Sequence, residues 1–113
     1  MADHLGELEQ VLLFALVRLG ADAYGASIRR EIEQQTGRSL SPGAIYTAMD
    51  RLELRGFVTS RLGDATPVRG GRRKKLYRLE PAGARALSGC YERLQRMAQG
   101  ALAQLGELVR GVS

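Results

Sequence analysis

The chain has one cysteine, one histidine and no tryptophan among its 113 residues. A single thiol, Cys90, cannot form an internal disulfide or a tetrahedral zinc cage. His4 lies in a segment expected to be a mobile tail, far from Cys90, so a cysteine–histidine catalytic pair is not expected. We interpret Cys90 as a structural thiol and expect a protein of a reducing, cytoplasmic compartment that holds no metal ion.

Long hydrophobic runs and nucleotide-binding motifs are missing as well. The longest apolar run, VLLFALV at residues 11–17, is too short to span a bilayer, and acidic residues precede it where a signal peptide carries basic ones. We interpret it as a buried helix face and expect no membrane partner. The segment RGGRRKK lacks the spacing of a P-loop, and no G-x-G-x-x-G follows a strand. The sequence therefore indicates neither an enzyme nor a cofactor-binding protein.

Acidic residues are absent from the stretch RGGRRKKLYR, residues 69–78. The whole chain has 17 basic and 12 acidic residues, a net charge of +5, and without the six basic residues of this stretch it has 11 against 12, or −1. A positive patch on an otherwise neutral body predicts a polyanionic partner, whereas the alternative is a solvated basic loop with no partner. The six residues are Arg69, Arg72, Arg73, Lys74, Lys75 and Arg78.

Two amphipathic helices are expected in the first third of the chain. The first, over residues 5–19, follows from leucines spaced by 3, 4, 4 and 3 residues: Leu5, Leu8, Leu12, Leu16 and Leu19. The second begins near Tyr24 and ends before Gly37, with Ile28 and Ile32 on its apolar face. Tyr24 either begins that apolar face or reaches a phosphate, and both interpretations stay open.

A third helix is expected in SPGAIYTAMDRLELRGFV, residues 41–58. Ser41 is a suitable N-cap, Pro42 suits the first helical position, and Gly56 ends the helix. One face of this helix is apolar, with Ile45, Ala48, Met49 and Leu52. The other face carries hydroxyls and charges, with Tyr46, Thr47, Asp50, Arg51 and Glu53.

A β-hairpin is expected next, with strands at residues 57–62 and 72–79 around a basic, glycine-bearing loop at residues 63–71. Three helices followed by a hairpin is the order of a winged helix-turn-helix domain. The predicted fold class is therefore mainly α with a β-hairpin, and the predicted DNA-binding domain spans residues 1–80.

One long C-terminal helix is expected to follow, over about residues 81–110 within a dimerisation segment at residues 81–113. Steps of 4 and 3 residues give it a heptad-type seam, and the simplest partner for that seam is a second copy of the chain. Three glycines count against the helix, Gly89, Gly100 and Gly106. The seam comprises Leu87, Tyr91, Leu94, Ala98, Ala101, Leu105 and Leu108.

Three motifs together resemble the PadR family of bacterial transcriptional regulators, over roughly residues 5–88. AYGASI at residues 23–28 resembles the family's Tyr-Gly motif on the second helix. LSPGAIYTAMDRLELRGFV at residues 40–58 resembles its recognition helix, and GGRRKKLYRLEPAGARAL at residues 70–87 resembles its wing and the start of its last helix. The single C-terminal helix expected here is similar to the smaller PadR subgroup.

This resemblance implies a homodimeric repressor that binds an inverted-repeat operator in double-stranded DNA and is released by a small-molecule effector. The chain departs from the family pattern at three positions. An aromatic residue is frequent where Ala26 stands and a proline where Thr47 stands, and Glu80 replaces the usual threonine N-cap. The effector comes from the resemblance alone. With no tryptophan in the chain, an effector site would have to use Phe14, Tyr91 or methionines.

The predicted DNA contacts lie on the second helix, the third helix and the wing. We expect Ser41 and Tyr46 to bind phosphates and Thr47 to contact a base edge, while Arg51 either contacts DNA or pairs with a neighbouring glutamate. The full set is Tyr24, Ser41, Gly43, Tyr46, Thr47, Asp50, Arg51, Arg72, Arg73, Lys74 and Lys75. Two other functions stay open, a non-specific nucleic-acid-binding protein and a winged-helix adaptor that binds protein.

Overall fold

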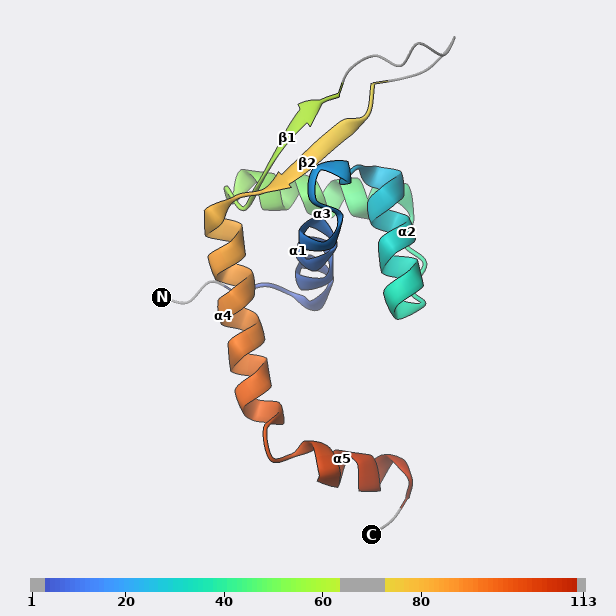
Figure 1. The fold of residues 1–113 in the computed structure, drawn as a ribbon, viewed down its shortest axis with the longest axis vertical. Helices are drawn as coiled ribbons and strands as arrows, with labels where there is room; N and C mark the ends of the chain where they lie inside the picture. The colour runs from blue at the N-terminus through green and yellow to red at the C-terminus, as the bar shows by residue number, and fades with distance from the viewer. Residues whose placement is uncertain (1–3, 64–72, 112–113) are drawn as a thin grey trace.

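The structure of the chain is a computed structural model that describes residues 4–63 and 73–111. Three helices and a two-stranded hairpin follow one another in the order that the sequence predicts for a winged helix-turn-helix domain, and two C-terminal helices come after them (Figure 1). The fold class, mainly α with a β-hairpin, is confirmed. The elements are α1 (Glu7–Leu19), η1 (Gly20–Asp22), α2 (Gly25–Thr36), α3 (Pro42–Leu54), β1 (Val58–Leu62), β2 (Lys75–Leu79), α4 (Pro81–Ala98) and α5 (Leu102–Val109).

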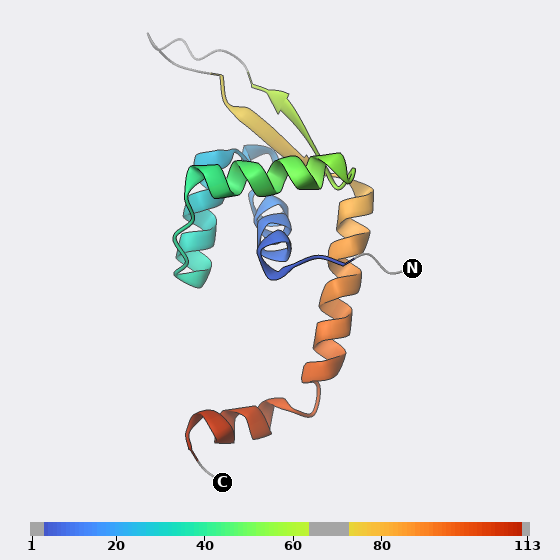
Figure 2. The same ribbon diagram turned by 180° about the vertical axis from the view of Figure 1, so that it is seen from behind.

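The core is built around α1, whose side chains Leu12 and Leu13 are completely buried. Helices α2, α3 and α4 pack against α1. Seen from behind, α3 runs across the domain from the α2 side to the α4 side, so its outer face looks away from the core (Figure 2). Leu5, which precedes α1, is also buried and extends the core beyond the helix itself.

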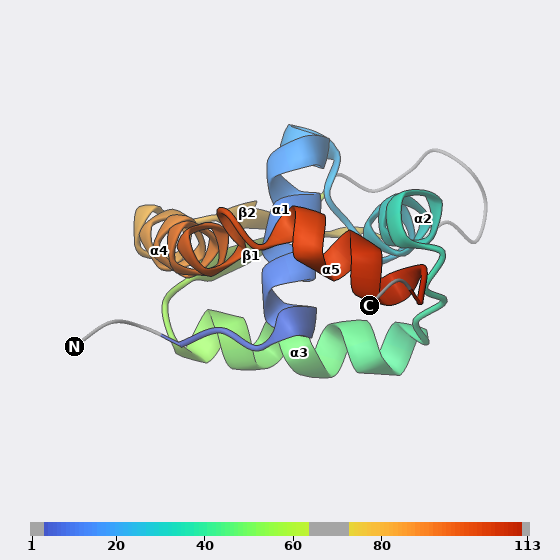
Figure 3. The ribbon, with the colours of Figure 1, turned by 90° about the horizontal axis from the view of Figure 1, so that it is seen from below.

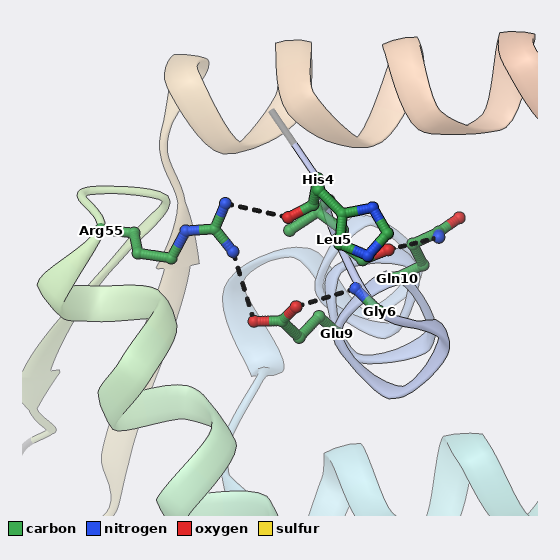
Figure 4. Close-up of polar contacts among 6 residues, drawn as sticks. All are labelled: His4, Leu5, Gly6, Glu9, Gln10 and Arg55. Carbon is green, nitrogen blue, oxygen red and sulfur yellow. Dashed lines mark hydrogen bonds and ion pairs between the residues drawn. The ribbon is translucent and has the colours of Figure 1, made fainter. Parts of the chain in front are cut away.

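The end of α3 is tied to the beginning of α1 by the side chain of Arg55 (Figure 4). Its Nη2 donates a hydrogen bond to the carbonyl oxygen of His4 at 2.9 Å, and its Nη1 lies 3.5 Å from Oε2 of Glu9. The other carboxylate oxygen of Glu9 accepts from the N–H of Gly6 at 2.9 Å. Contacts of this kind connect the segment from His4 onward to α3, which differs from the free tail that the sequence suggests at His4.

The hairpin is antiparallel, and Ser60 faces Tyr77 in its register. The second strand, β2, also pairs with the segment before α2. The N–H of Tyr77 donates a hydrogen bond to the carbonyl of Ala23 at 2.8 Å, and Tyr24 forms an antiparallel bridge with Leu76. The base of the wing is thus attached directly to the start of α2.

The C-terminal region differs from the expected single helix over residues 81–110. Helix α4 ends at Ala98 and α5 begins at Leu102, because Gly100 between them has a φ of 79°. This left-handed conformation suits glycine and interrupts the helix. Because of this break, α5 runs at an angle to α4, from the end of α4 past α1 toward the α2 side (Figure 3).

The first half of α4 belongs to the core of the winged-helix domain. Ala86, Leu87 and Cys90 are buried in the same cluster as the side chains of α1. Gly83 lies so close to Phe57, the residue before β1, that a Cβ there would collide with the Phe57 carbonyl oxygen. The expected domain boundary at residues 80 and 81 therefore cuts through the core, because the first half of α4 packs on its own chain.

Candidate nucleic-acid interface

Helix α3 has the two faces that its sequence predicts. The N-cap is Ser41, whose Oγ accepts a hydrogen bond from the N–H of Ala44 at 3.1 Å. The buried face consists of Ile45, Ala48, Met49 and Leu52. The exposed face carries the predicted contacts Gly43, Tyr46, Thr47, Asp50 and Arg51.

The side chain of Tyr46 rests on the first residue of α2. A Cβ added at Gly25 would lie 2.6 Å from the Tyr46 hydroxyl oxygen and 3.0 Å from the ring carbon that bears it. With any larger residue at position 25, the Tyr46 ring would have to move away from this position. The sequence interpretation did not assign Gly25 a role, although the Tyr-Gly pair within AYGASI was the available signal. The Tyr46 hydroxyl thus lies against the start of α2.

Tyr24 lies among cations rather than in the core. It is the N-cap of α2, its ring is half-buried, and the Nζ of Lys74 lies 4.1 Å from the ring centroid. Its hydroxyl oxygen accepts a hydrogen bond from Nη2 of Arg30 at 3.1 Å. The bond from Arg30, followed by the contact with Lys74, holds the pKa of Tyr24 below its usual value. The alternative in which Tyr24 begins the apolar face of the helix is therefore wrong, and Arg30 is a residue that the sequence interpretation missed.

The wing and α3 are connected by an ion pair between Lys75 and Asp50. The Nζ of Lys75 lies 3.9 Å from Oδ1 of Asp50, and it also lies 5.6 Å from the ring centroid of Tyr77. Lys75 thereby offsets the negative charge that Asp50 would otherwise present beside a polyanion.

Arg51 points to solvent, and the ion pairs found between described residues do not include it. The neighbouring carboxylate of Glu53 instead accepts a hydrogen bond from the hydroxyl of Ser60 on β1 at 2.9 Å. Of the two alternatives for Arg51, the structure gives no support to pairing with this glutamate.

An open, positively charged groove forms where α2, α3 and the wing meet. Arg73 and Lys74 are exposed at its rim, and Lys75 is half-buried beside them. Three cations and two phenol groups together suit a phosphate, because each can donate to or attract its oxygens. The groove is lined by Tyr24, Gly25, Ala26, Tyr46, Arg73, Lys74 and Lys75.

The groove unites five of the predicted DNA contacts, while the others lie elsewhere. Ser41 at the N-cap of α3, and Gly43, Thr47, Asp50 and Arg51 on its exposed face, do not line the groove. Arg69 and Arg72 fall outside the described residues, so of the basic stretch at residues 69–78 the structure describes residues 73–78.

Tyr77 of β2 is a buried tyrosine of the core. Its side chain is buried, with 3% of its surface exposed, and its hydroxyl makes no hydrogen bond within the described part of the chain. Burial, with smaller contributions from Tyr46, Asp50 and Glu53, raises the pKa of Tyr77 to about 12.

The predicted dimerisation seam divides into separate surfaces. Leu87 is only 4% exposed and packs in the core of its own chain, so its assignment to a contact between chains is wrong. Tyr91 meets Phe14 of α1 edge to face, with ring centroids 5.9 Å apart. Leu94 on α4 is 62% exposed and available to another chain, whereas the remaining seam residues lie at or beyond the break: Ala98, Ala101, Leu105 and Leu108.

Residues 4–63 and 73–111 contain no group of three or more His, Cys, Asp or Glu side chains that could hold a metal ion. Within the same residues, none of the helices has both the length and the apolar character needed to cross a membrane.

Comparison with known proteins agrees with this arrangement. Residues 12–89 match the model of the transcriptional regulator PadR-like family. The chain is 32% identical over 78 residues to Transcriptional regulator Rv3488 of Mycobacterium tuberculosis, a match that covers 69% of this chain and 68% of that protein.

Solved structures with a similar fold include two transcriptional regulators. One is a transcriptional regulator from Clostridium thermocellum, with a TM-score of 0.68, 24% identity, and coverage of 81% of this chain and 84% of that chain. The other is a PadR-like transcriptional regulator from Bacillus cereus, with a TM-score of 0.63, 19% identity, and coverage of 90% of both chains. At these identities the two structures establish the fold alone.

Proposed function

Because the chain belongs to the PadR-like family of transcriptional regulators, we propose that it represses transcription by binding an inverted-repeat DNA operator as a homodimer. The observation that carries this proposal is the positively charged groove at the junction of α2, α3 and the wing. The groove lies beside the exposed face of α3, so a phosphate held there would belong to DNA that the same helix contacts.

In this proposal the N-terminal half of α3 enters the major groove of DNA. Recognition helices contact base edges with residues near their N-terminus, and Thr47 lies there on the exposed face. Ser41 and Tyr46 contact phosphates on either side, and Gly43 allows the DNA backbone to approach. Base contact by Thr47 supplies the sequence preference, and the phosphate contacts fix the register.

The wing supplies most of the remaining electrostatic attraction. Arg73, Lys74 and Lys75 lie along one phosphate backbone, and Tyr24 lies between two of the cations that bind it. Each neutralised phosphate releases counterions, so binding should weaken steeply with added salt.

Dimerisation joins two such domains and allows both halves of an inverted repeat to be bound at once. Leu94 and the other exposed apolar residues of α4 and α5 are the surface that we propose for this contact. The resemblance also leads us to propose release by a small molecule, for which the exposed edge-to-face pair of Phe14 and Tyr91 is the available aromatic surface.

Selection of bound sequences from a random duplex pool tests the proposal directly. We expect the purified protein to enrich an inverted repeat whose halves lie about one helical turn apart. Binding with steep salt dependence but no enriched sequence would instead support a non-specific nucleic-acid-binding protein. Failure to bind any duplex at low salt would support a protein-binding adaptor.

A further inference from the structure

Tyr24 is held through both its backbone and its side chain. As the N-cap of α2, its N–H donates a hydrogen bond to Oγ of Ser27 at 2.9 Å, and the residue forms an antiparallel bridge with Leu76 of β2. Its hydroxyl oxygen accepts a hydrogen bond from Nη2 of Arg30 at 3.1 Å. The backbone contacts thus place the residue beside the wing, and the bond from Arg30 holds its hydroxyl.

The bond from Arg30 also decides which role is left to the Tyr24 hydroxyl. A phenol accepts a hydrogen bond at its oxygen and donates one through its proton, whereas a guanidinium group only donates. Arg30 can therefore engage the oxygen of Tyr24 but not the proton. Between the described residues, no hydrogen bond uses that proton. It is available to an acceptor atom outside the chain.

The groove between α2, α3 and the wing is the place where such an acceptor would lie. Tyr24 lines this groove together with Arg73, Lys74 and Lys75, whose charges attract an anion to it. Arg30 does not line the groove. Its Cα lies about 9 Å further along α2, and its side chain reaches back to the hydroxyl because side chains on a helix point toward the N-terminus.

Positive charge beside the Tyr24 ring makes its hydroxyl a stronger donor. The Nζ of Lys74 lies 4.1 Å from the ring centroid, and the Cζ of Arg30 lies 6.0 Å from it. The bond from Arg30, followed by the contact with Lys74, holds the pKa of Tyr24 below its usual value. A more acidic hydroxyl donates a stronger hydrogen bond to an anionic oxygen.

We propose that Arg30 is a positioning residue for DNA binding: by engaging the hydroxyl oxygen of Tyr24, it directs the hydroxyl proton toward a phosphate oxygen in the groove. This inference rests on the proposed function and adds to it a residue that acts without touching the phosphate. Because Arg30 acts through Tyr24, its effect depends on the Tyr24 hydroxyl. Phosphate contacts carry no base preference, so the effect is the same on duplexes of any sequence.

A double-mutant cycle on DNA affinity tests whether Arg30 acts through Tyr24. Fluorescence anisotropy at low salt, with a duplex of random sequence, compares the wild type, Arg30→Gln, Tyr24→Phe and the variant with both changes. Arg30→Gln should weaken binding about fivefold or more when Tyr24 is present. In the Tyr24→Phe background the same change should weaken binding about twofold or less.

Arg29 provides the matched control. It is the next residue along α2, it is exposed, and it takes part in none of the hydrogen bonds or ion pairs found between described residues. Arg29→Gln removes the same charge without removing a contact to Tyr24, so it should weaken binding about twofold or less in both backgrounds.

Ultraviolet titration of the tyrosines gives a readout that does not involve DNA. The difference in tyrosinate absorbance between a protein and its Tyr24→Phe counterpart reports the pKa of Tyr24. Arg30→Gln should raise this pKa, because it removes the bond that contributes most to lowering it, whereas Arg29→Gln should change it less. Circular dichroism confirms that each variant keeps its fold.

The outcomes separate this inference from the proposed function. Equal losses of affinity from Arg30→Gln in both backgrounds, or a loss no greater than that from Arg29→Gln, would overturn the role of Arg30 and leave DNA binding intact. An unchanged pKa of Tyr24 in Arg30→Gln would overturn that role as well. Failure of the wild type to bind any duplex would overturn the proposed function and this inference together.

Discussion

The ammonium group of Lys74 lies 4.1 Å from the centroid of the Tyr24 ring, which places the wing of the domain directly against the start of α2. The contact is reinforced by the bridge between Tyr24 and Leu76 and by the hydrogen bond from Arg30 to the Tyr24 hydroxyl. The wing base is therefore held in place before DNA arrives. If these cations bind a phosphate as we propose, they are already held near the start of α2.

The wing cations should control the salt dependence of DNA binding. Each phosphate contact contributes about 0.9 to the slope of log affinity against log salt concentration. Replacing Arg73 and Lys74 by alanine should flatten that slope by roughly 1 to 2 per wing, measured by fluorescence anisotropy between low and physiological salt. The control is Arg96→Ala on α4, an exposed cation far from the groove, which should leave the slope unchanged. An equal slope in the wing variant and the wild type would contradict the assignment.

Thr47 and Tyr46 should affect DNA binding differently. Thr47→Ala should relax the preference at about one base pair of each half-site, with a loss of discrimination of about 1–3 kcal/mol. Tyr46→Phe removes a phosphate contact and should weaken all sequences about equally. Binding-site selection with each variant separates the two effects. If Thr47→Ala returns the wild-type motif unchanged, Thr47 does not read a base.

Gly43 offers a test in which stability and binding change in opposite directions. A Cβ at this position meets no atom within 4 Å, so Gly43→Ala should stabilise the fold by about 0.5–1 kcal/mol, as expected for alanine in a helix. The same methyl group should obstruct close approach of DNA and lower affinity. Thermal unfolding and a binding titration measure the two quantities, and unchanged affinity would remove Gly43 from the interface.

Leu94 should be needed for dimerisation and not for folding. It is 62% exposed on α4, so Leu94→Asp leaves the core intact but places a charge in the proposed interface, where an unpaired charge is strongly unfavourable. The variant should sediment as a monomer and lose most of its affinity for a duplex with two half-sites, while its affinity for one half-site barely changes. Gln95→Asp, on the adjacent exposed position, should remain dimeric. A Leu94→Asp protein that stays dimeric would place the contact elsewhere.

Tyr77 should make the fold sensitive to alkaline pH. Its pKa is about 12 in the folded chain and about 10 when unfolded, so below pH 10 the hydroxyl is protonated in both states and has no effect on pH dependence. Between pH 10 and 12 the unfolded chain ionises first, and stability should fall by up to about 3 kcal/mol.

Urea unfolding of Tyr77→Phe at pH 8 and pH 11 tests this assignment. At pH 8 the variant should be at least as stable as the wild type, because it lacks a buried hydroxyl without a partner. At pH 11 it should lose less stability than the wild type, whereas Tyr91→Phe, at an exposed position, should lose the same amount. Equal losses in all three proteins would show that Tyr77 does not cause the decline.

The local structure of the recognition helix could be predicted from the sequence. The cap at Ser41 and the apolar spacing of Ile45, Met49 and Leu52 depend on neighbours within a few residues, and the helix forms where these signals predict it. The concentration of positive charge in the wing is likewise a property of composition. These features depend on residues that are close together in the sequence, so the sequence alone is enough to predict them.

Contacts between distant segments could not be predicted in this way. The fit of Tyr46 over Gly25 and the pairing of Lys75 with Asp50 depend on how α2, α3 and the hairpin meet, which no local spacing specifies. Leu87 shows the same limit, because a regular apolar spacing is equally suited to a dimer seam and to a buried face. Packing of α4 on α1 placed Leu87 in the core, and the left-handed conformation of Gly100 turned the rest of the expected seam into a separate arm. Periodicity thus determined which side chains must be covered, and only the tertiary structure decided which of them the chain covers itself.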